Sequence, residues 1–157
     1  MPEEKFFAYV LDGKKRQIKD ITSNVGHLLI TGIIAEEKVP KIINRLMQPD
    51  IFTPYGIRTL SIDSAYYSEQ SPAAYHNGSI WPHDNGMIYL GLKKLGYTQE
   101  AERVKEVVLE AEWILFKERG LRNPELYLVT SKGELTPYPT AAHPQGWVVD
   151  ANKYVFT

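Results

Sequence analysis

Residues 75–85 read Tyr-His-Asn-Gly-Ser-Ile-Trp-Pro-His-Asp-Asn, and the rest of the chain is organised around this stretch. It holds two imidazoles, a carboxylate, two carboxamides, an indole and a phenol. Apolar residues then recur with helical spacing, which predicts a helix over 82–95. Pro82 suits the first turn, where backbone N–H groups have no partner within the helix, and Asp84 suits the positive end of the helix dipole. The motif is therefore expected in a loop and in the first turn of a helix.

A loop of this composition offers a flat apolar face beside many hydrogen-bond donors and acceptors, which are the groups that bind a sugar ring. A structural interpretation stands beside this one, because Asp84 and Asn85 are residue types that cap helices and Trp81 can fill a core. His76, His83 and Asp84 could also reach a cation. Neither a helical His-x-x-x-His spacing nor a cysteine supports a metal site, however. We therefore expect no metal ion and no cofactor.

Length and composition indicate one domain, residues 1–157, because 157 residues of which 43% are hydrophobic can bury a core. The formal net charge of −1 argues against nucleic acid or an anionic membrane as partner. No apolar run has the length of a membrane span, and residues 1–4 are acidic where a secretion signal would be basic. The chain has no cysteine, which excludes disulfides. We expect a cytoplasmic location.

The N-terminal part combines a hairpin with a helix. Residues 5–11 and 16–21 have strand-like composition around an Asp-Gly turn, and they predict a short β-hairpin. A Ser-Asn cap then predicts a helix over 23–34. Gly26 and Gly32 lower its helix propensity, so we expect both to allow close packing against a neighbouring element.

Helical spacing of apolar residues predicts three further helices, at about 37–48, at 98–119 and from 145 onward. Two long connections, 50–74 and 121–144, separate the helices and are rich in Pro and Tyr. A loop this long inside a compact domain is usually functional or disordered. The aromatic, weakly charged composition of the first connection favours an ordered, functional loop, with an extended piece over 57–60.

Five separated segments resemble the helical glycosidases of the glycogen-debranching (amylo-α-1,6-glucosidase) and glucoamylase type. They occur in the family's order with similar gaps and together span about residues 5–150. The segments are SNVGHLL (23–29), YGIRTL (55–60), YHNGSIWPHDN (75–85), NPEL (123–126) and PQGW (144–147).

The resemblance implies an (α/α)6 toroid with the active site formed by loops at one end. The predicted helices account for the C-terminal part of such a barrel, so we expect a mainly α, partial toroid with a short N-terminal β-hairpin. The upstream half, which carries the general acid in these enzymes, is absent from this sequence. Gly146 stands where the family commonly has alanine, and the neighbouring Trp147 is expected in the core.

Glycoside hydrolysis needs a carboxylic acid that protonates the leaving oxygen and a carboxylate that acts as base or nucleophile. Inverting enzymes, which this chain resembles, hold the two groups about 6.5–9.5 Å apart with a water between them. By position in the family pattern, Glu125 corresponds to the general base. Glu134 and Asp84 are rival carboxylates, and Asp84 could instead fix the loop or bind a sugar hydroxyl. Without the resemblance, Glu125 would be taken for an ordinary surface charge.

The resemblance also implies a sugar subsite lined by Tyr75, His76 and Trp81. Trp81 would stack on the ring or form a wall of the pocket, and His76 would bond a hydroxyl. Trp81 as core filler and His76 as an ordinary loop histidine are the structural alternatives. Arg58 is a further candidate for substrate contact, although an ion pair with Asp63 that holds the long loop explains it equally well.

The order of helices predicts where these residues meet. The helix over 82–95 runs away from the motif, and the helix over 98–119 returns after a short link, since so short a link joins antiparallel helices. Loops 61–80 and 121–143 should therefore lie at the same end of the helices. This arrangement would bring Glu125 to the same concavity as His76, close to Trp81.

We expect the chain to be a fragment or subunit of a glucan-acting, inverting glycoside hydrolase that supplies the general base and part of the sugar pocket and is inactive alone. Its substrate would be an α-glucan or oligosaccharide. A complementary barrel half or a second copy should associate with it, because inner-helix residues such as Val25 and Leu29 would otherwise stay uncovered. A non-catalytic carbohydrate-binding protein and a self-associating helical scaffold are the alternatives.

Overall fold

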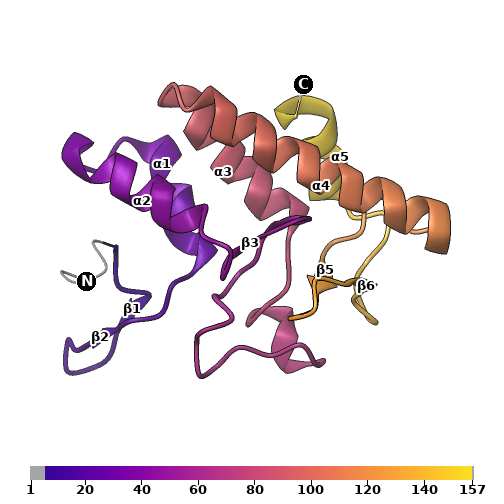
Figure 1. Cartoon of the computed structure of the whole chain (residues 1–157), viewed down its shortest axis with the longest axis horizontal. Helices are drawn as coiled ribbons and strands as arrows, with labels where there is room; N and C mark the ends of the chain where they lie inside the picture. Colours follow the sequence, from indigo (N-terminus) through magenta and orange to yellow (C-terminus); the bar gives the residue numbers. More distant parts are fainter. Residues whose placement is uncertain (1–5, 157) are drawn as a thin grey trace.

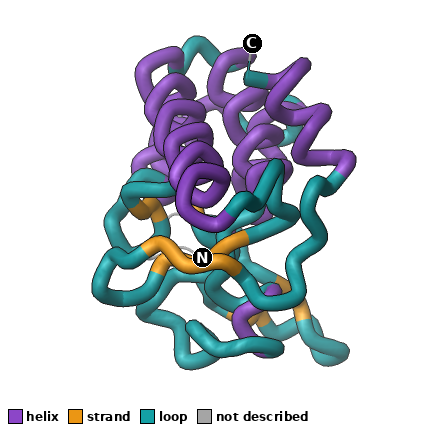
Figure 2. Tube along the Cα trace, turned by 90° about the vertical axis from the view of Figure 1, so that its right-hand side faces the viewer, coloured by secondary structure: helices purple, strands orange, loops and turns teal. Residues whose placement is uncertain are grey.

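The computed structural model describes residues 6–156, without the side chains of residues 154 and 155. Residues 1–5 lie outside this range. They include residues 1–4, in which the sequence predicts no secretion signal, and residue 5, the expected start of the first strand. Helices gather at one end of the molecule, and loops with short strands gather at the other (Figure 2). None of the helices in the described part of the chain is long and apolar enough to cross a membrane.

The predicted N-terminal hairpin is confirmed, with shorter strands than expected. β1 (Val10–Leu11) pairs antiparallel with β2 (Gln17–Ile18). Asp12 closes the turn, because its Oδ1 accepts hydrogen bonds from the backbone N–H groups of Lys14 and Arg16 at 2.8 and 2.9 Å. All four strand residues are exposed, so the hairpin has no buried face that would stabilise longer strands.

The helix predicted over 23–34 begins at the expected residue and ends early. It consists of the 3-10 helix η1 (Ser23–His27) and α1 (Leu28–Thr31), and it stops at Gly32 with a φ of +75°. A Cβ on Gly26 would lie 2.5 Å from Cγ1 of Ile88, which confirms close packing there. The same expectation for Gly32 is wrong, because nothing lies within 4 Å and the residue serves a left-handed helix end.

The second predicted helix follows the expected pattern. The short η2 (Glu36–Lys38) leads into α2 (Val39–Leu46). Four apolar residues of α2 are buried at the i, i+3, i+4, i+7 positions, as expected for one face of an amphipathic helix. These residues are Val39, Ile42, Ile43 and Leu46.

A long antiparallel helix pair runs across the helical end of the molecule (Figure 1). α3 (Pro82–Lys94) and α4 (Thr98–Arg119) have the predicted bounds within a residue or two. α3 is covered by α4, by η1 and α1, and by the C-terminal segment. At Gly91 an added Cβ would lie 2.6 Å from Cβ of Leu29, so the glycine lets α1 approach α3 closely. This packing buries Val25 and Leu29, and the expectation that they lack neighbours is therefore wrong.

Both long connections contain short strands. The sequence predicted only the extended piece over 57–60, where residues 56–57 form a strand and residues 58 and 60 form isolated bridges. β3 (Phe52–Thr53) pairs with β4 (Gly56–Ile57), and β5 (Tyr127–Val129) pairs with β6 (Leu135–Pro137). Ile80 joins the two connections, because it forms one bridge with residue 58 and another with residue 127. The backbone bonds between Ile80 and residue 127 measure 2.8 and 3.0 Å. The two loops therefore lie at the same end of the helices, as predicted.

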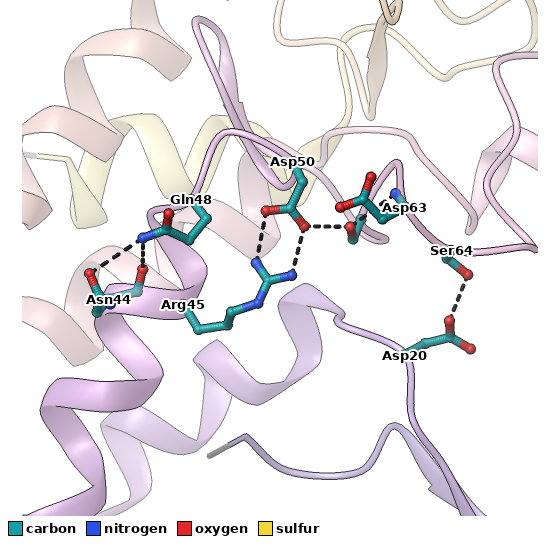
Figure 3. Close-up of polar contacts among 8 residues, drawn as sticks. Asp20, Asn44, Arg45, Gln48, Asp50, Asp63 and Ser64 are labelled. Carbon is teal, nitrogen blue, oxygen red and sulfur yellow. Dashed lines mark hydrogen bonds and ion pairs between the residues drawn. The ribbon is translucent and has the colours of Figure 1, made fainter. Parts of the chain in front are cut away.

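The first long connection is tied to α2 and to the N-terminal segment by side-chain contacts (Figure 3). Arg45 donates to both carboxylate oxygens of Asp50, at 2.9 and 2.8 Å, and Ser61 Oγ donates to the same carboxylate. Burial acts to raise the pKa of Asp50, but the bonds from Arg45 and Ser61 outweigh it and lower that pKa. Ser64 Oγ donates to Asp20 Oδ1 at 2.6 Å. The connection is thus ordered by specific bonds.

The last helix starts where expected, and its tryptophan does not enter the core. α5 (Gly146–Asp150) continues into the π-helical turn η4 (Ala151–Val155). The side chain of Gln145 accepts a bond from the Val148 N–H at 3.1 Å and caps the helix. Val148 occupies the buried position, so the adjacent Trp147 points outward and is 62% exposed. The prediction that Trp147 belongs to the core is wrong.

Candidate active site

The 75–85 motif is fixed to the rest of the chain by the amide of Asn85, which is fully buried. Asn85 Oδ1 accepts from the Ile57 N–H at 2.8 Å, and its Nδ2 donates to the carbonyl oxygens of Ile57 and Trp81, both at 3.0 Å. One side chain therefore satisfies polar groups of β4 and of the residue that precedes α3. Sequence reasoning treated Asn85 only as a possible cap and missed this clamp.

Glu125 meets the motif through Tyr75, the last residue of the 3-10 helix η3 (Ala73–Tyr75). The Tyr75 hydroxyl donates to Glu125 Oε1 at 2.7 Å, and the Ala142 N–H donates to Oε2 at 3.1 Å. The backbone N–H of Glu125 in turn donates to the Ala142 carbonyl at 2.8 Å. The bond to Glu125, with burial and the nearby charge adding to it, raises the pKa of Tyr75 to about 12. Tyr75 thus keeps its proton and orients the carboxylate.

Three rings of the motif pack together beside this carboxylate. The Tyr75 and Trp81 rings meet edge to face with centroids 5.0 Å apart, and His76 stacks on Trp81 at 5.8 Å with nearly parallel planes. The indole N–H donates to the Tyr75 carbonyl at 3.1 Å and to Ser79 Oγ at 2.9 Å. The structure therefore brings Glu125, Tyr75, His76 and Trp81 into one cluster, which we call the Glu125 cluster.

Asp84 lies elsewhere, in the first turn of α3, and makes its contacts with η1. It accepts from Ser23 Oγ and pairs with Nε2 of His27. The bond to Asp84 raises the pKa of His27, and burial opposes that rise. Of the roles considered for Asp84, the contacts correspond to fixing the loop, and they do not place this carboxylate beside Glu125.

Arg58 directly follows β4 in the first connection and is buried, and its side chain contacts Tyr67 and not the Glu125 cluster. Its Nη1 donates to the Tyr67 hydroxyl at 2.8 Å, and its guanidinium lies 5.4 Å from the centre of that ring. Burial lowers the pKa of Arg58. The expected ion pair with Asp63 is wrong, because Arg58 is buried and bonds to Tyr67, while Asp63 is exposed in a turn where its N–H donates to Ser61 Oγ.

A cavity of about 340 Å3 opens beside the Glu125 cluster. Its wall includes His76 and Asn77 of the motif together with Asp20, Thr22 and Tyr66. Glu125 is not part of this wall. This cavity is therefore not the concavity that Glu125 and His76 were expected to share. His76 connects this cavity to the Glu125 cluster, because its ring also stacks on Trp81. Sequence reasoning missed the contribution of the N-terminal hairpin, whose exposed tyrosine was the available signal.

The described residues include no group of three or more His, Asp or Glu side chains that could hold a metal ion.

One carboxyl with a strongly raised pKa lies outside the Glu125 cluster. Glu112 on α4 is 7% exposed, and burial raises its pKa to about 7, against the effect of a bond from Asn152. Its Oε1 has no hydrogen-bond partner in the described part of the chain. This carboxyl joins α4 to η4.

Glu112 should make stability fall as pH rises. Its folded-state pKa of about 7 lies above the ordinary value of 4.5, so its stabilising contribution is complete below the lower value and is lost as pH rises through the upper one. Above pH 8, Glu112→Gln should raise the free energy of unfolding by on the order of 3 kcal/mol. Urea denaturation at pH 5 and pH 8.5 measures the effect. The exposed neighbour Glu110→Gln is the control, and equal pH dependence of Glu112→Gln and wild type would contradict the prediction.

The sequence of this chain matches a known protein family. A family model described as "Mannosylglycerate hydrolase MGH1-like glycoside hydrolase domain" matches residues 2–117. The match includes the whole 75–85 motif and ends before Glu125. No curated protein matches the chain in sequence.

Solved structures share the fold over nearly the whole chain. The GH63 mannosylglycerate hydrolase from Thermus thermophilus, in complex with glucose, aligns with a TM-score of 0.73 and 19% identity over 99% of this chain and 34% of that chain. Neutral trehalase Nth1 from Saccharomyces cerevisiae aligns with a TM-score of 0.75 and 18% identity over 96% of this chain and 26% of that chain. The chain thus spans only a part of these structures. Their likeness confirms the predicted mainly α, partial (α/α)6 toroid with a short N-terminal hairpin.

Proposed function

This chain belongs to the family of mannosylglycerate hydrolase MGH1-like glycoside hydrolase domains, and on that basis we propose that it forms part of an inverting active site for an α-glucan or oligosaccharide. The observation that carries the proposal is the Glu125 carboxylate, held by Tyr75 beside the rings of His76 and Trp81. The five segments that resemble glycogen-debranching and glucoamylase-type enzymes support a glucan as substrate.

Glu125 is the general base in this proposal. A base that activates water needs a fixed carboxylate with an acceptor position left for that water. Tyr75 and the Ala142 N–H each occupy one position on the two oxygens, and a carboxylate can accept about four bonds. Glu125 is half-buried, so its remaining acceptor positions stay within reach of solvent. Trp81 and His76 would contact the sugar ring next to that water.

The general acid would come from a protein segment outside residues 1–157. The chain covers 34% of the solved mannosylglycerate hydrolase and 26% of the trehalase, which leaves most of a toroid to be supplied. A complementary barrel half fits this need, whereas a second copy of the chain would complete the barrel without adding an acid. Exposed apolar residues on α5 support such an association, since Trp147 is 62% and Val149 is 37% exposed.

The purified chain 1–157 should bind a glucoside without hydrolysing it. Inverting hydrolysis needs both the acid and the base, and this chain supplies only the base. Glucose release from maltose, isomaltose and glycogen should stay at the level of a protein-free blank. Binding of maltose should quench tryptophan fluorescence, and Trp81→Ala should abolish that response whereas Trp113→Ala on α4 should keep it. Turnover by the pure wild-type chain that Glu125→Gln abolishes would overturn the division of acid and base.

A further inference from the structure

The cavity beside His76 has the size and composition of a small-molecule site. We call it the hairpin cavity, because Tyr9 and Ile18 of the β1–β2 hairpin line it, together with Thr59, Asn77 and His76. Its volume of about 340 Å3 lies at the lower end of the range of about 300–1,000 Å3 that is typical of ligand pockets. One sugar residue is a ligand of suitable size.

Polar and aromatic groups in the hairpin cavity match a polyhydroxylated ligand. Tyr9 and Tyr66 are 47% and 67% exposed, so their rings can contact the apolar face of a sugar. Thr22 is 2% exposed, and its Oγ1 has no hydrogen-bond partner among the described residues. A buried hydroxyl without a partner is costly, and a ligand hydroxyl would satisfy it.

The charge of the wall distinguishes between classes of glycoside. None of the wall residues, all of which lie in the described part of the chain, is lysine or arginine. Asp20 contributes a carboxylate whose Oδ1 accepts from Ser64 at 2.6 Å (Figure 3). Its second oxygen can accept from a ligand hydroxyl, and the same charge would repel a carboxylate on the ligand.

We propose that the hairpin cavity binds the second residue of a neutral di- or oligosaccharide and selects against glycosides whose aglycone carries a carboxylate. This inference rests on the proposed function, and it deepens it by naming the substrate class. His76 connects the two parts of the substrate, because it lines the hairpin cavity and stacks on Trp81 of the Glu125 cluster. The acidic aglycone of mannosylglycerate, which the solved Thermus enzyme is named for, would not suit this wall.

The test compares two glucosides that differ in one group of the aglycone, a neutral hydroxymethyl or a charged carboxylate. Isothermal titration of chain 1–157 at pH 7 would use glucosylglycerol, which is neutral, and glucosylglycerate, which carries a carboxylate. The neutral ligand should bind at least about tenfold more tightly, a difference equivalent to about 1.4 kcal/mol. Asp20→Lys should reduce or reverse this preference by about tenfold. The exposed Glu37→Lys on η2 changes the net charge equally and should leave the preference unchanged.

A second pair of variants examines the buried hydroxyl. Thr22→Val should weaken maltose binding about fivefold to tenfold, the effect of one lost hydrogen bond, while the exposed Thr140→Val should not change it. Near-UV circular dichroism verifies that each variant is folded, and Asp20→Asn is the milder substitution if Asp20→Lys unfolds the chain. With Asp20→Asn the preference for the neutral ligand should fall without reversing.

The outcomes separate this inference from the proposed function. Equal binding of the two glucosides, or a preference that survives both Asp20 variants, overturns the neutral subsite. If Trp81→Ala still abolishes binding in that case, the proposed sugar site stands without the hairpin cavity. Failure of the chain to bind maltose or either glucoside overturns both. A tenfold preference that depends on Asp20 and Thr22 but not on Trp81 supports the cavity and counts against the Glu125 cluster.

Discussion

Glu125→Gln should lower the hydrolysis of an α-glucoside by about 10³-fold in the assembly that supplies the missing acid, because a positioned general base contributes about 10²–10⁴-fold. Glutamine keeps an oxygen that can accept the bond from Tyr75, which measures 2.7 Å in the wild type. The cluster should therefore survive while the basic carboxylate is lost. The measurement is kcat for glucose release by the chain coexpressed with the barrel segment that carries the acid.

Glu134→Gln is the matched control for this prediction. Glu134 is the rival carboxylate on the same loop, and the structure places it at the exposed turn that precedes β6. Its substitution should change kcat by less than about twofold, since an exposed side chain away from the reacting atoms contributes little to the barrier. Loss of activity in Glu134→Gln with retention in Glu125→Gln would transfer the role of base from one residue to the other.

Asn85→Ala should lower the free energy of unfolding by about 3–5 kcal/mol, because each buried polar group left without a partner costs about 1–3 kcal/mol. The substitution removes three bonds, at 2.8, 3.0 and 3.0 Å, and strands the N–H and carbonyl of Ile57. The Trp81 carbonyl keeps the bond from the backbone N–H of residue 85, at 3.0 Å. Urea denaturation followed by far-UV circular dichroism measures the loss. The release of Trp81 should also weaken maltose binding by the folded fraction.

Asn44→Ala provides the control for the loss of an asparagine. Asn44 is exposed on α2, and among the described residues its side-chain oxygen has a single contact, accepted from Gln48 Nε2 at 3.4 Å. Its substitution should change the free energy of unfolding by less than about 0.5 kcal/mol. A change of similar size in both variants would mean that the buried amide of Asn85 has no special part in holding the motif to β4.

The family model matches residues 2–117, whereas Glu125, the proposed base, lies beyond them. The structure bridges this gap, because Tyr75 inside the matched region donates directly to Glu125 outside it. The proposed role of Glu125 thus depends on a contact between loops that are 50 residues apart in sequence. The Glu125→Gln experiment tests that role independently of the family match.

Local residue patterns were enough to define α2, α3 and α4 and the antiparallel pairing of α3 with α4. Pro82, Gly96 and Gly120 mark the ends of α3 and α4, and the spacing of apolar residues from Val39 to Leu46 defines the buried face of α2. These features can be read from the sequence, because a helix depends on residues within a few positions of one another. The antiparallel α3–α4 pair follows from its short link, and it brings the two long loops to one end.

The use of the side chains in those loops depends on tertiary packing. The strands β3 to β6 are two or three residues long, too short for an alternating pattern to be read, and Ile80 bridges both connections. The clamp made by Asn85 depends on Ile57, 28 residues away in the chain, and the inward direction of Arg58 and the outward direction of Trp147 depend on how their segments pack. Local spacing carries no information about such partners, since they come into contact only when the helices pack. The sequence therefore specified which residues lie in the loops, and the packing brought Glu125 to Tyr75 and Asp84 to His27.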